Sequence, residues 1–79
     1  MQPEIAEKLN TVFRHVFQDP SLQVHDAMTA GEVANWDSLS HMTMIQEVEK
    51  AFGIKFKLKE ITRMKDVGDM ATLIQEKLA

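Results

Sequence analysis

The first apolar residues of the chain recur at the spacing of one helix face. They lie one, three or four residues apart and comprise Ile5, Leu9, Val12, Phe13, Val16 and Phe17. This periodicity is typical of a helix that buries one side against a core. Pro3 suits the first turn, where its missing N–H has no helical partner, and Asp19-Pro20 cannot continue the helix. We therefore expect a first helix that begins near Pro3 and ends before Asp19.

Residues 18–37 form a long connection for so small a chain. Polar residues dominate this segment, but four apolar residues are spaced among them: Leu22, Val24, Met28 and Val33. A long loop in a small domain is usually functional or held down by such apolar contacts. We expect a loop that crosses one end of a helical bundle, with one short turn near Thr29–Val33.

A second helix is predicted over Ser38–Phe52, because Gly53 offers the usual C-terminal cap. At about 100° per residue, one arc of this helix collects its apolar core face. The arc comprises Met44, Ile45, Val48, Ala51 and Phe52. Leu39 falls on the opposite side, Met42 at the margin and Gln46 between the two. An apolar side chain on the polar side of the helix start indicates a docking surface.

The last third of the chain contains one extended stretch and two further helices. Residues 54–59, Ile-Lys-Phe-Lys-Leu-Lys, alternate strictly, which indicates an extended loop with one buried face. Glu60–Met64 is expected to form a short helix. The final helix follows Asp66 as its cap, and its stripe comprises Val67, Met70, Ala71, Ile74 and Leu78. The whole pattern predicts an all-α fold, a small four-helix bundle with three main helices, a short third helix and a long first loop.

Length and composition limit what such a fold can do. The 79 residues are expected to form one domain, whose thin core leaves little room for a deep active site. The chain has no cysteine, which excludes disulfides, thiolate metal sites and a cysteine nucleophile. No apolar run is long enough to cross a membrane, and residues 1–10 do not resemble a secretory signal. We therefore expect a cytoplasmic monomer that does not insert into membranes.

The net charge of −3 hides an uneven distribution. Residues 1–52 carry three Lys or Arg against eight Asp or Glu, whereas residues 53–65 carry five against one. The five basic residues are Lys55, Lys57, Lys59, Arg63 and Lys65. A net negative chain without a basic helix face argues against nucleic-acid binding. The lysines serve either to keep an extended loop in solution or to dock a partner.

Ser38 stands at the predicted start of the second helix, directly after Asp37. In one interpretation, either residue is simply the N-terminal cap. In the other, Ser38 carries a phosphate, because the free N–H groups and the dipole of a helix start favour negative charge. The long preceding loop would leave such a group exposed.

Residues 35–42, Asn-Trp-Asp-Ser-Leu-Ser-His-Met, resemble the attachment motif of acyl carrier proteins and of carrier domains in polyketide and peptide synthases. The core of that motif is Asp-Ser-Leu at the start of the second helix. Residues 47–54 resemble the end of the family's second helix, and residues 66–70 resemble the start of its last helix. The similarity covers nearly the whole chain, including the long first loop and the short third helix.

The resemblance implies a carrier with no catalytic residue rather than an enzyme. It implies that a phosphopantetheinyl transferase uses coenzyme A to attach 4'-phosphopantetheine to Ser38, and that the arm's thiol holds acyl intermediates as thioesters. Such a tether raises the effective concentration of the cargo at each partner enzyme. The implied partners load or process acyl groups, as a ketosynthase or an acyltransferase does, in fatty-acid, polyketide or related specialised biosynthesis. An aminoacyl or peptidyl carrier is the alternative.

The resemblance also assigns a partner-binding surface to five residues: Asp37, Leu39, Met42, Gln46 and Glu49. Four further residues are candidates for the lining of an acyl cavity, and three of them are methionines, which adapt to irregular space. These four are Met44, Val48, Met64 and Met70. Ordinary packing is the alternative for them.

Three positions depart from the pattern of bacterial fatty-acid carriers. Ser40 and Thr43 stand where that pattern is usually acidic, and Lys50 replaces another common acid. Electrostatic complementarity governs partner choice and association rate more than affinity. The altered surface therefore indicates a specialised carrier with partners of its own.

Asp37, Ser38 and His41 also contain the residue types of a hydrolase, since residues three apart are neighbours on a helix. No third group is evident to orient the histidine, however, and the strand–turn–helix setting of a nucleophilic serine is missing. His41 instead falls within the core arc of the second helix. We therefore expect a packed, hydrogen-bonded histidine.

The remaining aromatic and titratable residues carry no separate chemistry. Trp36, just before the second helix, is expected to anchor the end of the bundle. His15 and His25 share no metal-ligand spacing with His41, so no metal site is expected. The alternative from another functional class is a helical interaction domain that carries no modification.

Overall fold

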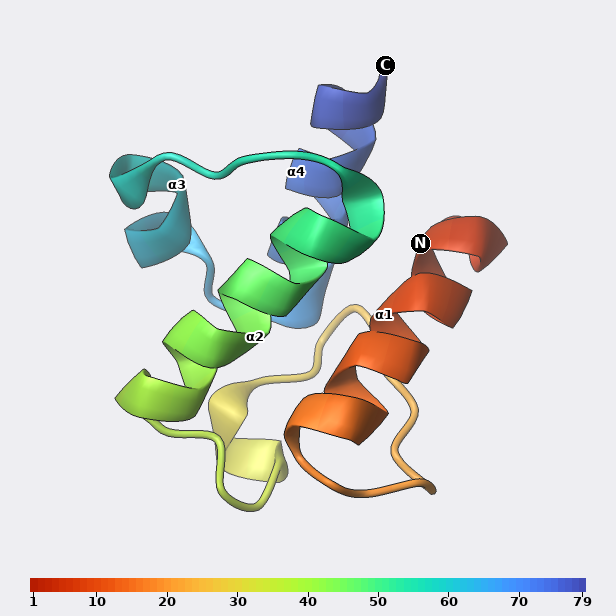
Figure 1. Cartoon of the computed structure of the whole chain (residues 1–79), viewed down its shortest axis with the longest axis vertical. Helices are drawn as coiled ribbons and strands as arrows, with labels where there is room; N and C mark the ends of the chain where they lie inside the picture. The colour runs from red at the N-terminus through yellow and green to blue at the C-terminus, as the bar shows by residue number, and fades with distance from the viewer.

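Four α-helices and one short 3₁₀ turn make up the fold, which contains no strand (Figure 1). The computed structural model describes all 79 residues. In chain order, the elements are α1 Pro3–Val16, η1 Ala30–Glu32, α2 Ser38–Phe52, α3 Leu58–Arg63 and α4 Val67–Leu78. The all-α four-helix fold, with its long first loop and short third helix, is confirmed. None of the helices has both the length and the apolar character that crossing a membrane requires.

The core lies where α1 packs against α2 and α4. Seventeen residues are buried, all of them apolar, and they form a single cluster. The largest fully buried side chains come from all three of these helices: Leu9, Phe13, Met44, Ile45, Val48, Val67, Met70 and Ile74. The short helix α3 contributes no buried residue. Burial of apolar surface therefore holds three helices together, and α3 lies beside them.

Two residues that the sequence assigns to core stripes are exposed instead. Ala51, in the last turn of α2, lies with Val12 and His15 in a shallow groove that is open to solvent. Leu78 is 51% exposed, because the final turn of α4 projects beyond the neighbouring helices (Figure 1). Periodicity predicts the direction of a side chain, but it does not predict how far the neighbouring helix extends.

The long first loop is held to the bundle by hydrogen bonds and apolar contacts. Oδ1 of Asn10 accepts a hydrogen bond from the N–H of Val24 (2.7 Å), and the carbonyl of Asp26 accepts one from the N–H of Gly68 (2.8 Å). A Cβ on Gly68 would lie 2.7 Å from that carbonyl oxygen, so this close approach requires glycine. Three of the loop's apolar residues are buried: Leu22, Met28 and Val33. The predicted short turn is present as η1.

The third helix begins two residues earlier than the sequence predicts. Residues 54–57 are extended and Phe56 is buried, as the alternation indicates. The extended stretch then ends, because Oε1 of Glu60 accepts a hydrogen bond from the N–H of Lys57 (2.8 Å) and closes the first turn of α3. The prediction that Leu58 continues the buried extended face is wrong. Leu58 is the first residue of α3 and is 74% exposed.

Candidate functional site

Ser38 is the first residue of α2, and its side chain is exposed. Asp37 caps the helix: its Oδ1 accepts a hydrogen bond from the N–H of Ser40 (2.9 Å), while Ser40 Oγ accepts one from the N–H of Asp37 (2.8 Å). Ser40 Oγ also donates to the carbonyl of Asn35 (2.7 Å). The predicted C-terminal cap is present too, since Gly53 has a left-handed backbone. Asp37 and Ser40 therefore cap the start of α2, and the Ser38 hydroxyl takes no part in the cap.

The carboxylate of Asp37 is ionised at neutral pH. Its pKa is lowered chiefly by the hydrogen bond from the backbone N–H of Ser40, and next by the hydrogen bond from the Ser40 side chain. A phosphate on Ser38 would therefore find one N–H of the helix start occupied and a negative charge beside it. The protein itself already uses part of the anion-binding capacity that a helix start provides.

Trp36 anchors the loop that leads to Ser38. Its indole ring packs edge-on against Phe13, with the ring centroids 5.4 Å apart, and lies tilted against Phe17 at 5.5 Å. The preceding Asn35 adopts a left-handed backbone (φ 70°), which asparagine tolerates better than most residues. The prediction that Trp36 is a packing anchor is confirmed. This anchor fixes the start of α2 relative to α1.

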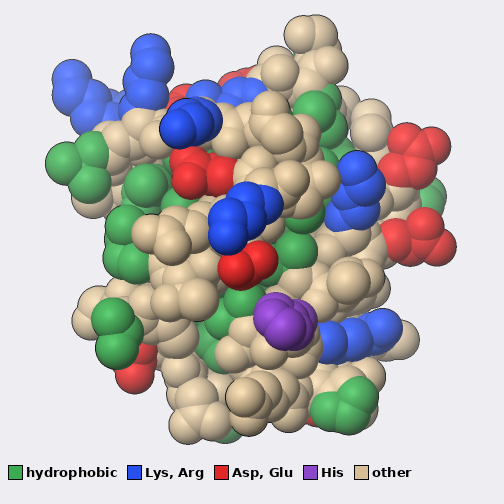
Figure 2. Space-filling model, viewed as in Figure 1, with side chains coloured by type: hydrophobic (Ala, Val, Ile, Leu, Met, Phe, Trp, Pro, Cys, Tyr) green, Lys and Arg blue, Asp and Glu red, His purple; other side chains and the backbone are tan.

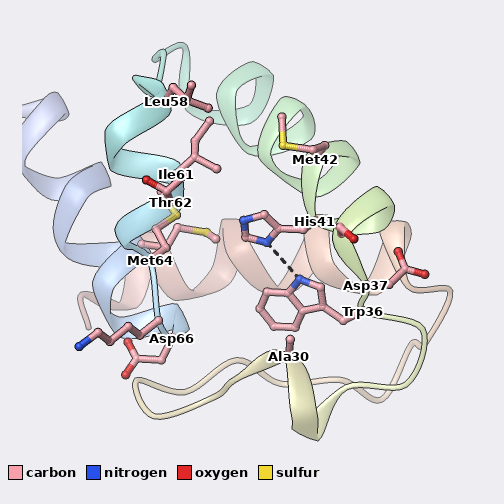
Figure 3. Close-up of a pocket in the computed structure, with 13 residues that line it drawn as sticks. Ala30, Trp36, Asp37, His41, Met42, Leu58, Ile61, Thr62, Met64 and Asp66 are labelled. Atoms are coloured by element: carbon pink, nitrogen blue, oxygen red, sulfur yellow. Dashed lines mark hydrogen bonds between the residues drawn. The ribbon is translucent and has the colours of Figure 1, made fainter.

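His41 lies in the first turn of α2 and stacks on Trp36, with 15° between the ring planes. The indole Nε1–H donates a hydrogen bond to Nδ1 of His41 (3.1 Å; Figure 3). Burial lowers the pKa of His41 from its ordinary value of 6.5, so the imidazole is neutral at physiological pH. The prediction of a packed, hydrogen-bonded histidine is confirmed. An indole rather than a carboxylate orients the ring, and no group of three or more His, Asp or Glu is placed to hold a metal ion.

A cleft of about 510 Å³ opens between the first half of α2 and α3 (Figure 3). Ser38 is one of its lining residues, so the exposed hydroxyl borders the cleft. Most of the other lining side chains are apolar or aromatic, and they include Trp36, His41, Met42, Leu58, Ile61, Met64 and Met70. The cleft therefore combines a free hydroxyl at its border with mainly apolar walls.

Only two of the four residues proposed for an acyl cavity reach this cleft. Met64 and Met70 line it, whereas Met44 and Val48 are fully buried in the core and do not border it. Ordinary packing is the role that the structure gives to Met44 and Val48. On this side of the cleft the sequence pattern predicts Met64 but not Leu58 and Ile61, although the three residues recur every three positions. That spacing marks one helix face once the start of α3 is known.

Two apolar side chains that line the cleft, Met42 and Leu58, are exposed, and so is Leu39, which follows Ser38 in the sequence but does not line the cleft. Leu39 is 79% exposed, Leu58 74% and Met42 43%. Gln46, further along α2, is exposed as well. The structure thus confirms that Leu39 points away from the core. Exposed apolar residues that gather beside a cleft are typical of a docking surface.

Glu49, which the resemblance assigns to the partner surface, makes a contact within the fold. Its Oε2 accepts a hydrogen bond from the backbone N–H of Phe56 (2.8 Å), and its side chain is half-buried. This bond ties the end of α2 to the α2–α3 loop and helps to hold Phe56 in the core. The carboxylate is therefore engaged inside the protein, and Glu49 is not part of the docking surface that we propose.

Basic side chains gather on the α2–α3 loop and α3. Lys55, Lys57 and Lys59 are exposed, and Figure 2 shows Lys and Arg side chains over this part of the molecule at the upper left. None of the three lysines forms an ion pair, whereas Glu60, the acid of this segment, pairs with Lys77 of α4 (2.9 Å). The uneven charge seen in the sequence thus becomes a basic patch next to the cleft.

Two comparisons find relatives of this chain, one by its sequence and one by its structure. An acyl carrier protein of Thermosynechococcus vestitus (strain NIES-2133 / IAM M-273 / BP-1) is 32% identical over 79 residues, which cover 99% of this chain and 96% of the relative. The solution NMR structure of the holo acyl carrier protein from Geobacter metallireducens superposes with a TM-score of 0.88 at 40% identity, over 98% of this chain and 87% of that one. No protein-family model matches the sequence. Both relatives extend over nearly the whole chain, so the two similarities concern the same residues.

Proposed function

Because this chain belongs to the acyl carrier protein family, we propose that Ser38 bears a 4'-phosphopantetheine arm whose thiol holds acyl groups as thioesters. Members of this family are carriers rather than enzymes. The solved relative is a holo acyl carrier protein, which implies that the prosthetic group is attached in that protein. We extend this attachment to Ser38, and we treat residues 1–79 as one carrier domain.

The exposed hydroxyl of Ser38, at the start of α2 and beside an apolar cleft, is the observation that carries this proposal. A transferase must reach the hydroxyl from outside, and an arm attached there can move between water and the cleft. The neighbouring Ser40 offers no such group, because its Oγ donates to the carbonyl of Asn35 and accepts from the N–H of Asp37.

The surroundings of Ser38 fit a phosphodiester that remains in water. Asp37 is ionised and occupies the N–H of Ser40, so the helix start does not form a closed anion pocket. Repulsion between two charges at an exposed site is weak, because water and salt screen it. The arm supplies the thiol that bonds the cargo, while the protein supplies a fixed attachment point and an apolar cleft.

The cleft favours an acyl cargo over an aminoacyl cargo. Leu58, Ile61 and Met64 would cover an acyl chain, and each buried methylene contributes about 0.8 kcal/mol. An ammonium group is costly to bury unless a carboxylate pairs with it. The two carboxylates of the lining, Asp37 and Asp66, both cap helices through backbone N–H groups. We therefore favour fatty-acid, polyketide or related specialised biosynthesis, with an aminoacyl or peptidyl carrier as the alternative.

The proposed docking surface combines the exposed start of α2 with the basic patch. Four residues come from α2 and its cap, Asp37, Leu39, Met42 and Gln46, and three come from the basic patch, Lys55, Lys57 and Lys59. A partner that fits this surface offers an apolar contact for Leu39 and acidic groups for the lysines. The partners are a phosphopantetheinyl transferase and acyl-loading or acyl-processing enzymes, such as a ketosynthase or an acyltransferase. We place the protein in the cytoplasm, where coenzyme A is available.

Loading with coenzyme A tests the proposal. The protein is incubated with coenzyme A and a broad-specificity phosphopantetheinyl transferase, and its intact mass is then measured. The wild-type protein gains one phosphopantetheine group, Ser38→Ala gains none, and Ser21→Ala, which changes an exposed loop serine, still gains one. A helical interaction domain without a modification would gain no mass with any of several transferases, and that result would overturn the proposal.

A further inference from the structure

His41 stands out as a polar group between the apolar walls of the cleft. Its Nδ1 accepts the hydrogen bond from Trp36 Nε1–H, so Nδ1 carries no proton. A neutral imidazole holds one proton, which must then reside on Nε2. The contact with Trp36 therefore fixes the tautomer and makes Nε2 a hydrogen-bond donor.

This donor is directed into the cleft. In Figure 3 the second ring nitrogen of His41 faces the side of the cleft formed by Ile61 and Met64. The hydrogen bond with Trp36 is the one side-chain bond that His41 makes in the protein. Every buried side-chain nitrogen or oxygen atom of the protein has a hydrogen-bond partner. Nε2 of His41 has no such partner, so it is not fully buried, and water reaches it while the cleft is open.

The other polar side chains of the lining are engaged or exposed. Asp37 and Asp66 cap α2 and α4, and the hydroxyl of Thr62 donates to the carbonyl of Lys59 (3.0 Å). Lys65 is exposed. The Nε2–H of His41 is thus the half-buried donor that a molecule inside the cleft meets.

We propose that the Nε2–H of His41 binds an oxo or hydroxyl oxygen on the chain of the acyl group carried on Ser38, beyond the thioester carbonyl, so that the cleft selects acyl groups with such a substituent over saturated ones. This inference rests on the proposed function, because it requires a cargo attached at Ser38. A saturated chain displaces water from Nε2 and leaves the donor without a partner, which costs about 1–3 kcal/mol. An oxo or hydroxyl oxygen on that part of the chain restores the hydrogen bond.

The acyl group is a better candidate for this oxygen than the arm itself. Ser38 is exposed, so the attached end of the arm begins in water. The Nε2 of His41 faces inward, toward Ile61 and Met64. An arm that folds into the cleft brings its acyl end between these apolar walls, and the free-thiol form distinguishes an acyl oxygen from the oxygens of the arm.

The inference is tested with three loaded forms of the protein: the free thiol, the butyryl thioester and the 3-hydroxybutyryl thioester. Each form is made by transfer from coenzyme A or from the matching acyl coenzyme A, and loading is verified by intact mass. Two quantities are then measured, the rate of thioester cleavage by hydroxylamine and the NMR signal of His41 Nε2. The cleavage rate reports how well the cleft shelters the thioester.

For each protein, the cleavage rate of the butyryl thioester is divided by that of the 3-hydroxybutyryl thioester. We expect this ratio to be about fivefold larger in the wild-type protein than in His41→Phe, because the cleft protects the hydroxylated thioester better. His41→Gln keeps most of this preference, because its amide can accept from Trp36 and donate to the cargo. His15→Ala, which removes an exposed histidine of α1, leaves the preference unchanged. The Nε2 signal of wild-type protein shifts with the hydroxylated cargo and shifts neither with the butyryl cargo nor with the free thiol.

Three results would contradict the inference. If the wild-type protein and His41→Phe show the same ratio of cleavage rates, His41 does not select the cargo. If the Nε2 signal has already shifted fully in the free-thiol form, the acceptor belongs to the arm. A protein that cannot be loaded at all overturns the proposed function and this inference with it, whereas a loaded protein without a preference overturns this inference alone.

Discussion

The indole N–H of Trp36 donates a hydrogen bond to Nδ1 of His41 over 3.1 Å, and the two rings stack with 15° between their planes. The two residues flank Ser38 in the sequence, and both line the cleft beside it. One contact thus joins the end of the first loop, the start of α2 and the wall of the cleft. Ser38, the proposed attachment point, is thus held on both sides without its own side chain being used.

The first prediction concerns this contact. Trp36→Phe keeps an aromatic ring but removes the N–H, so it leaves Nδ1 of His41 without its donor and reduces the contact with Phe13. We expect the free energy of unfolding to fall by about 1–3 kcal/mol in urea titrations. Ser38→Ala serves as the control, because the Ser38 side chain is exposed and takes no part in capping. Equal midpoints for Trp36→Phe and the wild-type protein would show that the contact does not stabilise the fold.

The second prediction concerns the pH dependence that His41 imparts. The pKa of His41 is lowered in the folded protein by burial, so between pH 6.5 and that lower value the unfolded chain binds more protons than the folded one. Stability is therefore full above about pH 6.5 and declines as the pH falls below it. Melting temperatures measured across this range should fall in the wild-type protein and fall less in His41→Gln. An identical decline in both proteins would assign the effect to other groups.

The third prediction concerns the cap of α2. The pKa of Asp37 is lowered by hydrogen bonds from Ser40, so its stabilising effect is present above its ordinary pKa of 3.8 and is lost as the pH falls below that value. At neutral pH, Asp37→Ala should lower the melting temperature, whereas Asp37→Asn should keep most of it, because asparagine also caps helices well. If the alanine variant melts at the wild-type temperature, the cap is dispensable for the fold.

The fourth prediction concerns the glycine that lets the first loop approach α4. In Gly68→Ala, the new Cβ would lie 2.7 Å from the carbonyl oxygen of Asp26, and a rigid backbone atom cannot move away easily. We expect a loss of about 1–3 kcal/mol in the free energy of unfolding. Gly31→Ala is the matched control, because its Cβ would meet only the Thr29 hydroxyl at 3.8 Å. A loss of equal size in both variants would contradict the close-approach explanation.

The fifth prediction concerns the basic patch. Replacing Lys55, Lys57 and Lys59 together by glutamate should slow transfer to or from the cognate partner at low salt, because the charges that attract an acidic partner are reversed. The difference should shrink as salt is added, since exposed charges are screened over about 10 Å at 0.1 M ionic strength. Transfer rates that equal those of the wild-type protein at low salt would leave the lysines as residues that keep the loop in solution.

Local signals in the sequence predicted most of the helices. These signals act over one or two helical turns, so the sequence pattern alone locates the helices. They are the apolar stripe of α1, the caps Asp37 and Gly53 at the two ends of α2, and the cap Asp66 at the start of α4. The start of α3 was placed too late. The carboxylate of Glu60 closes the turn at Lys57, and an alternating pattern does not reveal that hydrogen bond.

The candidate site was only partly predictable. Ser38 follows from a local motif, and the exposure of Leu39 follows from its angle on the helix. The wall of the cleft depends on how α3 lies against α2, and for this reason the sequence does not predict Leu58 and Ile61 in the lining, whereas Met44, a candidate for it, is packed in the core. The bond between Glu49 and the N–H of Phe56 likewise depends on the course of the α2–α3 loop.

Fragment mass spectrometry of the protein isolated from cells that produce it tests most directly whether Ser38 is the attachment point. The attachment to Ser38 predicts that one peptide carries a phosphopantetheine group and that the fragments on either side of Ser38 confine it to this residue. A group found on Ser40 or Ser21 instead would contradict the assignment. So would a protein that stays unmodified in cells whose transferase loads other carrier proteins.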